Sequence, residues 1–111
     1  MLYASEIVQD EAARKDVAIA AQKENQKIAV EIKSFLGYSL VSDFHLAVGQ
    51  VMNYRLILQR DEPDRVLYLA VPLDVYETFF KLEFIQLAIT TYQFKIIVYN
   101  TEDEVLLQWI N

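Results

Sequence analysis

The 111-residue sequence contains no cysteine, so disulfide bonds and thiolate metal sites are excluded. Histidine occurs once, which leaves no histidine pair of the kind that binds zinc. There are two glycines and two prolines, with no glycine-rich phosphate loop and no GxSxG segment. No apolar run reaches the roughly 20 residues that cross a bilayer, and nothing resembles a signal peptide. We therefore expect a cytoplasmic protein without a membrane contact.

Positive charge is also scarce. Ten basic residues stand against sixteen acidic ones, which gives a net charge of −6. The excess is uneven, because residues 1–73 carry eight basic and ten acidic side chains, whereas residues 74–111 carry two and six. Lysine and arginine supply most of the affinity of proteins for nucleic acid. We therefore expect weak DNA binding by the chain alone.

Apolar residues, in contrast, are abundant at 54% of the chain, and 13% are aromatic. The length suits a single domain over residues 1–111. A domain of this size buries a modest fraction of its surface, so part of the apolar material is available for an interface. Alternation along VLLQWI places large apolar groups on both faces of a C-terminal strand. This pattern predicts a homo-oligomer or a protein partner that contacts the C-terminal strands.

The periodicity of the chain predicts an α/β fold with a mixed sheet and helices on its faces. A glycine break and Ser39 or Ser42 as a cap precede a long predicted helix with an inward side that includes Val41 and Met52. In order, we expect a short helix over 1–15, a β-hairpin over 16–35, a helix over 40–59, a strand over 65–71, a helix from about 73, a helical segment over 84–92, and a hairpin made by 94–100 and 105–110.

Two carboxylates and a lysine are brought together by the predicted N-terminal hairpin. Period 2 puts Glu31 and Lys33 on one face of its second strand, and Asp16 opens the first strand. Such a group is costly unless it shares a cation, for which we predict Mg²⁺ held by Asp16, Glu31 and the backbone carbonyl of Ile32. Lys33 then orients water and stabilises developing charge. The alternative is a solvated strand face on which Glu31 and Lys33 have no catalytic role.

The spacing Asp-x14-Glu-x-Lys resembles the PD-(D/E)XK nuclease signature. The segments IAVEIKSFLG, DFHLAVGQVMNYR, EPDRVLYLAVPLDVYETFF, IVY and QWIN resemble the cyanobacterial XisH family, whose members are called fdxN element excision controlling factors. This resemblance runs from about Ile19 to Asn111 and implies a restriction-endonuclease-like fold. It also implies action beside a recombinase and a second small protein, XisI. The family's longer N-terminal lead-in is shortened here, and EAARKD replaces its usual glycine-containing segment.

A second pair of candidate site residues lies on the predicted long helix. Gln50 and Tyr54, spaced i and i+4, share one side of that helix. A Q-x3-Y pair after such a core is similar to the additional motif of RecB-type nucleases, which implies catalytic positions for both residues. The alternative is a half-buried core tyrosine beside a surface glutamine.

Other residues favour structural interpretations. Gly49 is expected to allow close packing of the long helix on the hairpin, although a plain packing role is equally consistent. His45 lies away from Gln50 on a regular helix and has no evident partner. Arg55, Arg60 and Arg65 can meet phosphates, but the acidic residues among them favour local ion pairing. We expect Tyr68, Tyr76, Phe79, Phe80, Phe84 and Trp109 in the core or an interface.

Two functions therefore stand at this point. The motif residues favour an XisH-like excision factor with possible Mg²⁺-dependent phosphodiester cleavage. The acidic charge, the altered N-terminus and the apolar content favour a non-catalytic interaction module with the same nuclease fold.

Overall fold

The computed structural model describes residues 2–3, 27–100 and 105–110 of the chain. Five strands form one sheet in the order β1-β2-β3-β4-β5. The strands are β1 (Leu2–Tyr3), β2 (Ile28–Ile32), β3 (Val66–Pro72), β4 (Ile96–Asn100) and β5 (Val105–Ile110). The helices are α2 (Leu40–Asp61), α3 (Leu73–Glu77), a 3-10 turn (Phe79–Lys81) and α4 (Glu83–Tyr92).

The sheet is mixed, as the sequence predicts. Strands β2, β3 and β4 are parallel, while β1 and β5 pair antiparallel at its two ends. Parallel neighbours need crossover connections. The crossover from β2 to β3 contains α2, and the crossover from β3 to β4 contains α3 and α4. The predicted antiparallel pairing of the last two strands is confirmed, whereas their turn (101–104) and the side chains of residues 105–109 lie outside the described set.

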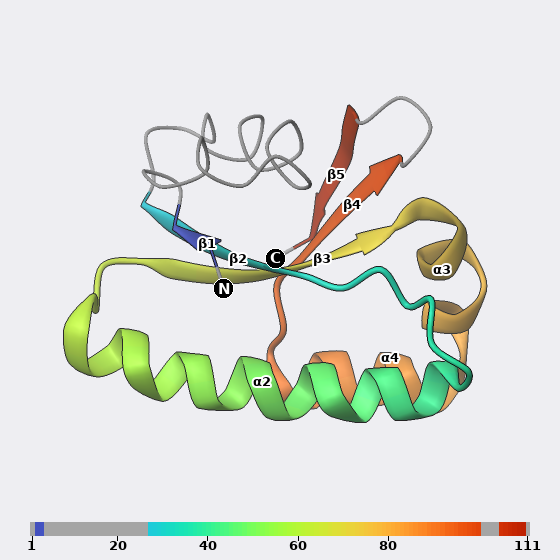
Figure 1. Ribbon diagram of the computed structural model, residues 1–111, viewed down its shortest axis with the longest axis horizontal. Helices are drawn as coiled ribbons and strands as arrows, with labels where there is room; N and C mark the ends of the chain where they lie inside the picture. The colour runs from blue at the N-terminus through green and yellow to red at the C-terminus, as the bar shows by residue number, and fades with distance from the viewer. Residues whose placement is uncertain (1, 4–26, 101–104, 111) are drawn as a thin grey trace.

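Both long helices lie against the same face of the sheet (Figure 1). Alternation along the strands directs Ala29, Leu69 and Val98 into the core between sheet and helices. Their strand neighbours Val30 and Ala70 belong to a second buried cluster on the opposite face. The central strands are therefore apolar on both sides, which explains the nearly continuous hydrophobic run that β3 shows in the sequence.

The N-terminal expectations need correction. Leu2–Tyr3 is a strand paired with β2 rather than part of the helix expected over 1–15, since it supplies backbone partners to Ala29 and Val30. Residues 4–26, including the expected first hairpin strand, lie outside the described residues. Its second strand is confirmed as Ile28–Ile32, but it pairs with β3 in parallel.

The long helix α2 is confirmed, and its 22 residues extend to Asp61. Ser39 is its N-cap, and the Ser39 hydroxyl accepts a hydrogen bond of 3.1 Å from the Ser42 N–H. Its inward residues are Phe44, Ala47, Val51 and Leu58. The expectation that Val41 and Met52 also face inward is wrong, because these side chains are 49% and 43% exposed.

The helix expected from about residue 73 is divided. Helix α3 ends at Glu77, and a 3-10 turn follows Thr78, whose hydroxyl donates a 2.7 Å hydrogen bond to the Asp74 carbonyl. The division lets Phe79 and Phe80 pack edge-to-face against Phe44. Aromatic packing decides against a continuous helix here. In the part of the chain that the structure describes, no helix is long and apolar enough to span a membrane.

Candidate functional site

Glu31 lies near the end of β2, on the sheet face that α2 covers. It follows Ala29 by two residues and stands opposite Leu69 on β3, both of which belong to the core beneath α2. The side chain is 7% exposed, and Glu31 is the one charged residue counted among the buried described residues. A solvated strand face, the alternative considered for Glu31, is therefore wrong. Burying a carboxylate costs free energy unless other groups stabilise it.

Tyr54 is one of the groups that stabilise this carboxylate. The half-buried tyrosine packs against the core from α2, and its hydroxyl is hydrogen-bonded to Glu31. Burial raises the pKa of Tyr54 above its ordinary value of 10.0, and the negative charge and hydrogen bond of Glu31 raise it further. Tyr54 therefore stays protonated near neutral pH and donates to the carboxylate.

Gln50 lies one helical turn before Tyr54 on α2. Its side-chain Oε1 atom is buried and has no hydrogen-bond partner among the described residues. A buried amide oxygen without a donor is uncommon and favours a cation or a donor from outside the described residues. Because α2 returns along the sheet after the turn that follows β2 (Figure 1), Gln50 is displaced from Tyr54 toward the C-terminal end of β2.

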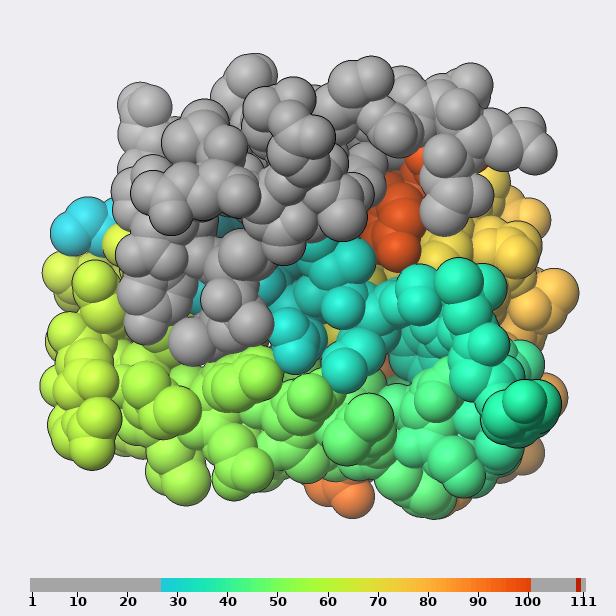
Figure 2. All heavy atoms as spheres, viewed as in Figure 1, coloured from blue at the N-terminus to red at the C-terminus, as the bar shows by residue number. Residues whose placement is uncertain are grey.

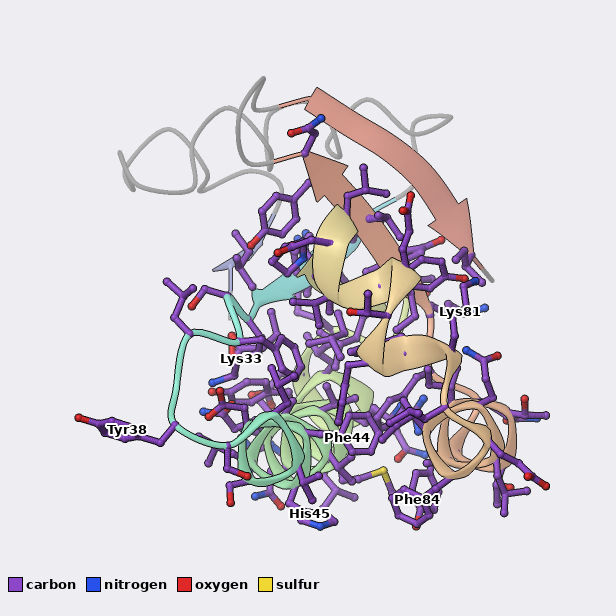
Figure 3. The ribbon with its side chains drawn as sticks, turned by 90° about the vertical axis from the view of Figure 1, so that its right-hand side faces the viewer. Lys33, Tyr38, Phe44, His45, Lys81 and Phe84 are labelled. Atoms are coloured by element: carbon purple, nitrogen blue, oxygen red, sulfur yellow. The ribbon has the colours of Figure 1, made fainter. Side chains whose placement is uncertain are left out.

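Lys33 continues the line of β2 beyond its last assigned residue. Its backbone N–H donates a 3.0 Å hydrogen bond to the Ala70 carbonyl, so the pairing with β3 persists and period 2 keeps Lys33 on the side of Glu31. The side chain is half-buried and lines a hollow of about 180 Å³ between the end of β2 and the start of α2. Figure 3 shows Lys33 above the first turns of α2.

The predicted metal ligands are only partly placed. Asp16 lies outside the described residues, whereas Glu31 and Ile32 are adjacent on β2. No group of three or more histidine, cysteine, aspartate or glutamate side chains gathers within residues 27–100 and the other described positions. A metal site would therefore combine Glu31 with amide and backbone oxygens, or with a carboxylate beyond the described part.

The other candidates of α2 face outward. Gly49 is exposed, and apart from the nearby backbone of its own helix no atom of the described residues lies within 4 Å of the position that a Cβ would occupy, so the expected close packing on the hairpin is wrong. Gly49 and the buried Ala47 and Val51 lie on different sides of the helix, which is why packing cannot involve it. His45 points away from the protein (Figure 3), in agreement with a residue outside the site.

The arginines divide into two groups. Arg60 forms an ion pair with Asp61 at 2.7 Å, and Arg65 lies 3.7 Å from Glu62, so local pairing is confirmed for both. Arg55 is different. Its guanidinium donates to the Gln93 carbonyl at 2.7 Å and lies over the Phe94 ring, so local ion pairing is wrong for this residue.

Sequence reasoning did not single out Lys95. The missed signal is positional, because Lys27, Arg65 and Lys95 each immediately precede one of the three parallel strands. Parallel strands start at the same edge of a sheet, so these cations come to one end of the molecule. Their common position could have been predicted once the strands were taken as parallel rather than as a hairpin.

The sequence was also compared with models of known protein families. The family model described as XisH protein matches residues 3–107. The chain belongs to the XisH family. A search of curated proteins found no match.

Two crystal structures are similar to this XisH-family chain. A structure described as an XisH family protein from Nostoc punctiforme PCC 73102 has a TM-score of 0.78 and 54% identity, covering 81% of this chain and 71% of that one. A structure described as an fdxN element excision controlling factor protein from Anabaena variabilis has a TM-score of 0.77 and 56% identity, covering 81% and 70%. Both support the mixed α/β architecture of this XisH-family member.

Proposed function

We propose that this chain is an excision controlling factor that acts on DNA in site-specific excision. We further propose that its sheet is a restriction-endonuclease-like core with a PD-(D/E)XK-type site at the end of β2. The family membership and the description of the Anabaena variabilis relative support the first statement. The observation that supports the second is the buried Glu31 carboxylate bonded to Tyr54 beneath α2.

The donors at this site suit Mg²⁺. Magnesium prefers oxygen ligands and is commonly bound through one or two carboxylates together with water. Glu31 supplies a carboxylate, and the Ile32 carbonyl follows it on the same strand. The buried Gln50 Oε1, which has no hydrogen-bond partner in the described part of the chain, is an oxygen that a cation or its water can satisfy. Asp16 is the further carboxylate predicted from the sequence.

Each residue has a separate task in the proposed reaction. When bound, Mg²⁺ supplies a Lewis acid that polarises the scissile phosphate and lowers the pKa of an attacking water. The Glu31 carboxylate would hold the ion, while the Tyr54 hydroxyl orients that carboxylate by its hydrogen bond. The Lys33 ammonium, on the same side of β2, orients the water and stabilises the charge that develops on the phosphate.

A magnesium titration that follows thermal stability and plasmid nicking in parallel tests this proposal. A ligand that binds only the native state raises its stability, and this gain grows with the logarithm of the ligand concentration above Kd. We expect Mg²⁺ to raise the melting temperature of the wild type and to support nicking. We expect Glu31→Gln to lose both responses, and Lys33→Ala to lose nicking while keeping the thermal response.

The matched control is Glu77→Gln, because Glu77 is an exposed glutamate at the end of α3. It should respond to Mg²⁺ like the wild type. Equal thermal responses of Glu31→Gln and Glu77→Gln would reject the metal site. A thermal response without nicking by wild type would keep the site and reject turnover by the chain alone.

The charge of the chain constrains how it meets DNA. With a net charge of −6, binding by the chain alone should be weak, should strengthen with Mg²⁺ and should show a shallow salt dependence. We propose that an XisI-like protein and a recombinase supply the remaining affinity in the excision complex. Anisotropy of labelled DNA across a salt series measures the slope, and a steep slope without Mg²⁺ would contradict this view.

A second candidate function, a non-catalytic interaction module, has one specific observation in its favour. The outer face of α2 carries Leu46, Met52 and Leu56, which are 56%, 43% and 67% exposed. Over residues 44–54 this helix has no charged residue. In the space-filling view α2 forms a continuous band across the molecule (Figure 2). Exposed apolar patches of this kind mark interaction surfaces.

Light scattering distinguishes the interaction surface on α2 from the proposed Mg²⁺ site. If the outer face of α2 binds a second copy, Leu56→Lys should shift the chain to a monomer while the Mg²⁺ response persists. Leu36→Lys is the control, because Leu36 is 88% exposed in the turn before α2. A clean monomer for the wild type at high concentration would remove self-association from the proposal.

A further inference from the structure

A basic pocket lies beside α2, at the end of the sheet where the parallel strands start. It has a volume of about 300 Å³ and is bounded by the last turns of α2, the start of β3 and the segment that leads from α4 into β4. Its polar lining consists of Arg55, Gln59, Arg65, Gln93 and Lys95, and none of its lining residues is acidic. In a chain with sixteen acidic residues, such a lining is not expected from composition.

Arg55 is held in this pocket by neutral groups alone. Its guanidinium donates to the Gln93 carbonyl at 2.7 Å and to the Met52 sulfur at 3.6 Å, and it lies 5.0 Å from the centre of the Phe94 ring. None of the described carboxylates lies within ion-pair distance of it. Burial lowers the pKa of Arg55, which means that its charge is partly desolvated without a compensating anion.

The backbone of Gln93 is shaped to hold this arginine. Gln93 caps α4 in the left-handed conformation with φ 57°, and its N–H bonds to the carbonyls of the last turn of α4. A non-glycine residue adopts this conformation at some cost, so the surrounding contacts must stabilise it. The result is a carbonyl that accepts the 2.7 Å hydrogen bond from Arg55 and holds the guanidinium in the pocket that Lys95 also lines.

Lys95 and Arg65 supply two further cations. Lys95 is half-buried just before β4, and no described carboxylate pairs with it. Arg65 is turned into the fold, where it donates a 2.8 Å hydrogen bond to the Ile28 carbonyl and lies 3.7 Å from Glu62. Glu62 thus offsets part of the charge of Arg65, and Arg55 and Lys95 carry the net positive charge of the pocket.

We propose that this pocket binds a phosphate group. Arginine and lysine together with amide donors match the several acceptor oxygens of a phosphate, and such charge-assisted hydrogen bonds are strong where water is partly excluded. A second hollow of about 790 Å³ adjoins the pocket and shares Arg55, Gln93 and Lys95 with it. It leaves room for whatever carries the phosphate, either a small phosphorylated molecule or a DNA backbone.

The pocket is separate from the Glu31 site. Tyr54 reaches β2 from one side of α2, whereas Arg55, the next residue, reaches Gln93 from another side. The pocket adjoins Val66 and Leu67 at the start of β3, while Glu31 stands opposite Leu69. Phosphate binding here therefore requires neither Mg²⁺ nor cleavage.

The test is a titration of the full chain with inorganic phosphate, followed by NMR amide shifts and by melting temperature. Sodium chloride at equal ionic strength is the reference. We expect saturable shifts centred on Gln93 and Lys95 and a higher melting temperature in phosphate than in chloride. Lys95→Met should weaken phosphate binding about tenfold or more, the loss expected for one hydrogen bond made by a charged group.

Lys81→Met is the matched control, because Lys81 is an exposed lysine whose ammonium lies over the Tyr76 ring, away from the pocket lining. It should bind phosphate like the wild type. Equal weakening by Lys95→Met and Lys81→Met, or no difference between phosphate and chloride in the wild type, would overturn the proposal. The chloride comparison does not depend on how well any variant folds.

A DNA arm identifies the source of the phosphate. If the pocket holds a DNA backbone, phosphate should compete with a labelled duplex, and Lys95→Met should weaken DNA binding more than Lys81→Met. If the pocket holds a small phosphorylated molecule, phosphate binding should persist with no effect of Lys95→Met on DNA. Both results support the pocket, and neither changes the outcome of the Mg²⁺ experiment at Glu31.

Discussion

The two sides of α2 differ in the chemistry they bring together. On the side facing β2, Tyr54 is hydrogen-bonded to the buried Glu31, and Gln50, one turn earlier, has a buried side-chain oxygen; we propose that these oxygen atoms favour a cation. On the side facing the α4–β4 segment, Arg55 joins Lys95 in a group that favours an anion. Tyr54 and Arg55 are adjacent in the sequence, and successive helix residues point about 100° apart. One helix can therefore serve two sites of opposite preference.

The contacts that hold the two sides also differ. Glu31 is hydrogen-bonded to the Tyr54 hydroxyl, so a substitution that removes this one oxygen atom tests the contact. Arg55 is fixed by a backbone carbonyl and an aromatic ring, so its position depends on the conformation of Gln93 and Phe94. We therefore expect substitutions at Glu31 or Tyr54 to change the structure only locally. We expect substitutions at Arg55 to change the structure at the end of α4 as well.

The largest expected effect comes from the support that both sides share. Phe44 is 1% exposed and packs against Phe79 and Phe80, which fixes the start of α2 against the 3-10 turn. Phe44→Ala should lower the free energy of unfolding by about 3–5 kcal/mol and weaken Mg²⁺ and phosphate responses together. Urea denaturation measures the loss. Leu56→Ala, at a 67% exposed position of the same helix, should change stability by less than about 0.5 kcal/mol.

Arg55→Met separates the two sides. The methionine keeps an apolar stem but loses the hydrogen bond to Gln93 and the contact with the Phe94 ring. We expect a loss of about 1.5–3 kcal/mol in unfolding free energy, as for a hydrogen bond made by a charged group. The phosphate response should disappear while the Mg²⁺ response remains. Loss of both responses in a folded variant would show that the two sides are coupled.

Tyr54→Phe is the reciprocal change. It removes the hydroxyl bonded to Glu31 and should cost about 1 kcal/mol, with a weaker Mg²⁺ response and an unchanged phosphate response. The wild type should also depend on pH here. The folded-state pKa of Tyr54 is raised, so its contribution is complete below pH 10.0 and is lost as the pH rises through the folded pKa.

Melting temperatures from pH 8 to 11 measure that dependence. The difference between wild type and Tyr54→Phe should be constant below pH 10.0 and should shrink above it. A difference that grows above that pH would mean that the ionised tyrosine is favoured in the folded state, contrary to its contact with Glu31.

The smallest expected effect lies outside both sides. Gly49 is in the middle of α2, and beyond the backbone of its own helix an added Cβ meets no atom of the described residues within 4 Å. Gly49→Ala should therefore stabilise the chain by about 0.5–1 kcal/mol through helix propensity and leave both ligand responses unchanged. If the outer face of α2 packs against a second copy, the same change should reduce dimerisation in light scattering.

The sequence by itself determined much of the local structure, and it determined on which side of β2 and α2 the candidate site residues lie. Alternation along β2 put the Glu31 side chain on one face of the sheet and those of Val30 and Ile32 on the other face. The spacing of Gln50 and Tyr54 put both on one side of α2. These features depend on the period of a single element, which neighbouring residues encode. The family resemblance over most of the chain was likewise contained in the sequence.

Only the tertiary structure decided which elements meet. It paired β2 with β3 and with Leu2–Tyr3, and it turned the apolar Val41 and Met52 outward because the sheet contacts a narrower part of α2 than its apolar residues span. It also brought Arg55 to Gln93, which lies 38 residues later. Such contacts depend on pairing and packing between distant segments. Local periodicity cannot determine them, because the same pattern satisfies several partners.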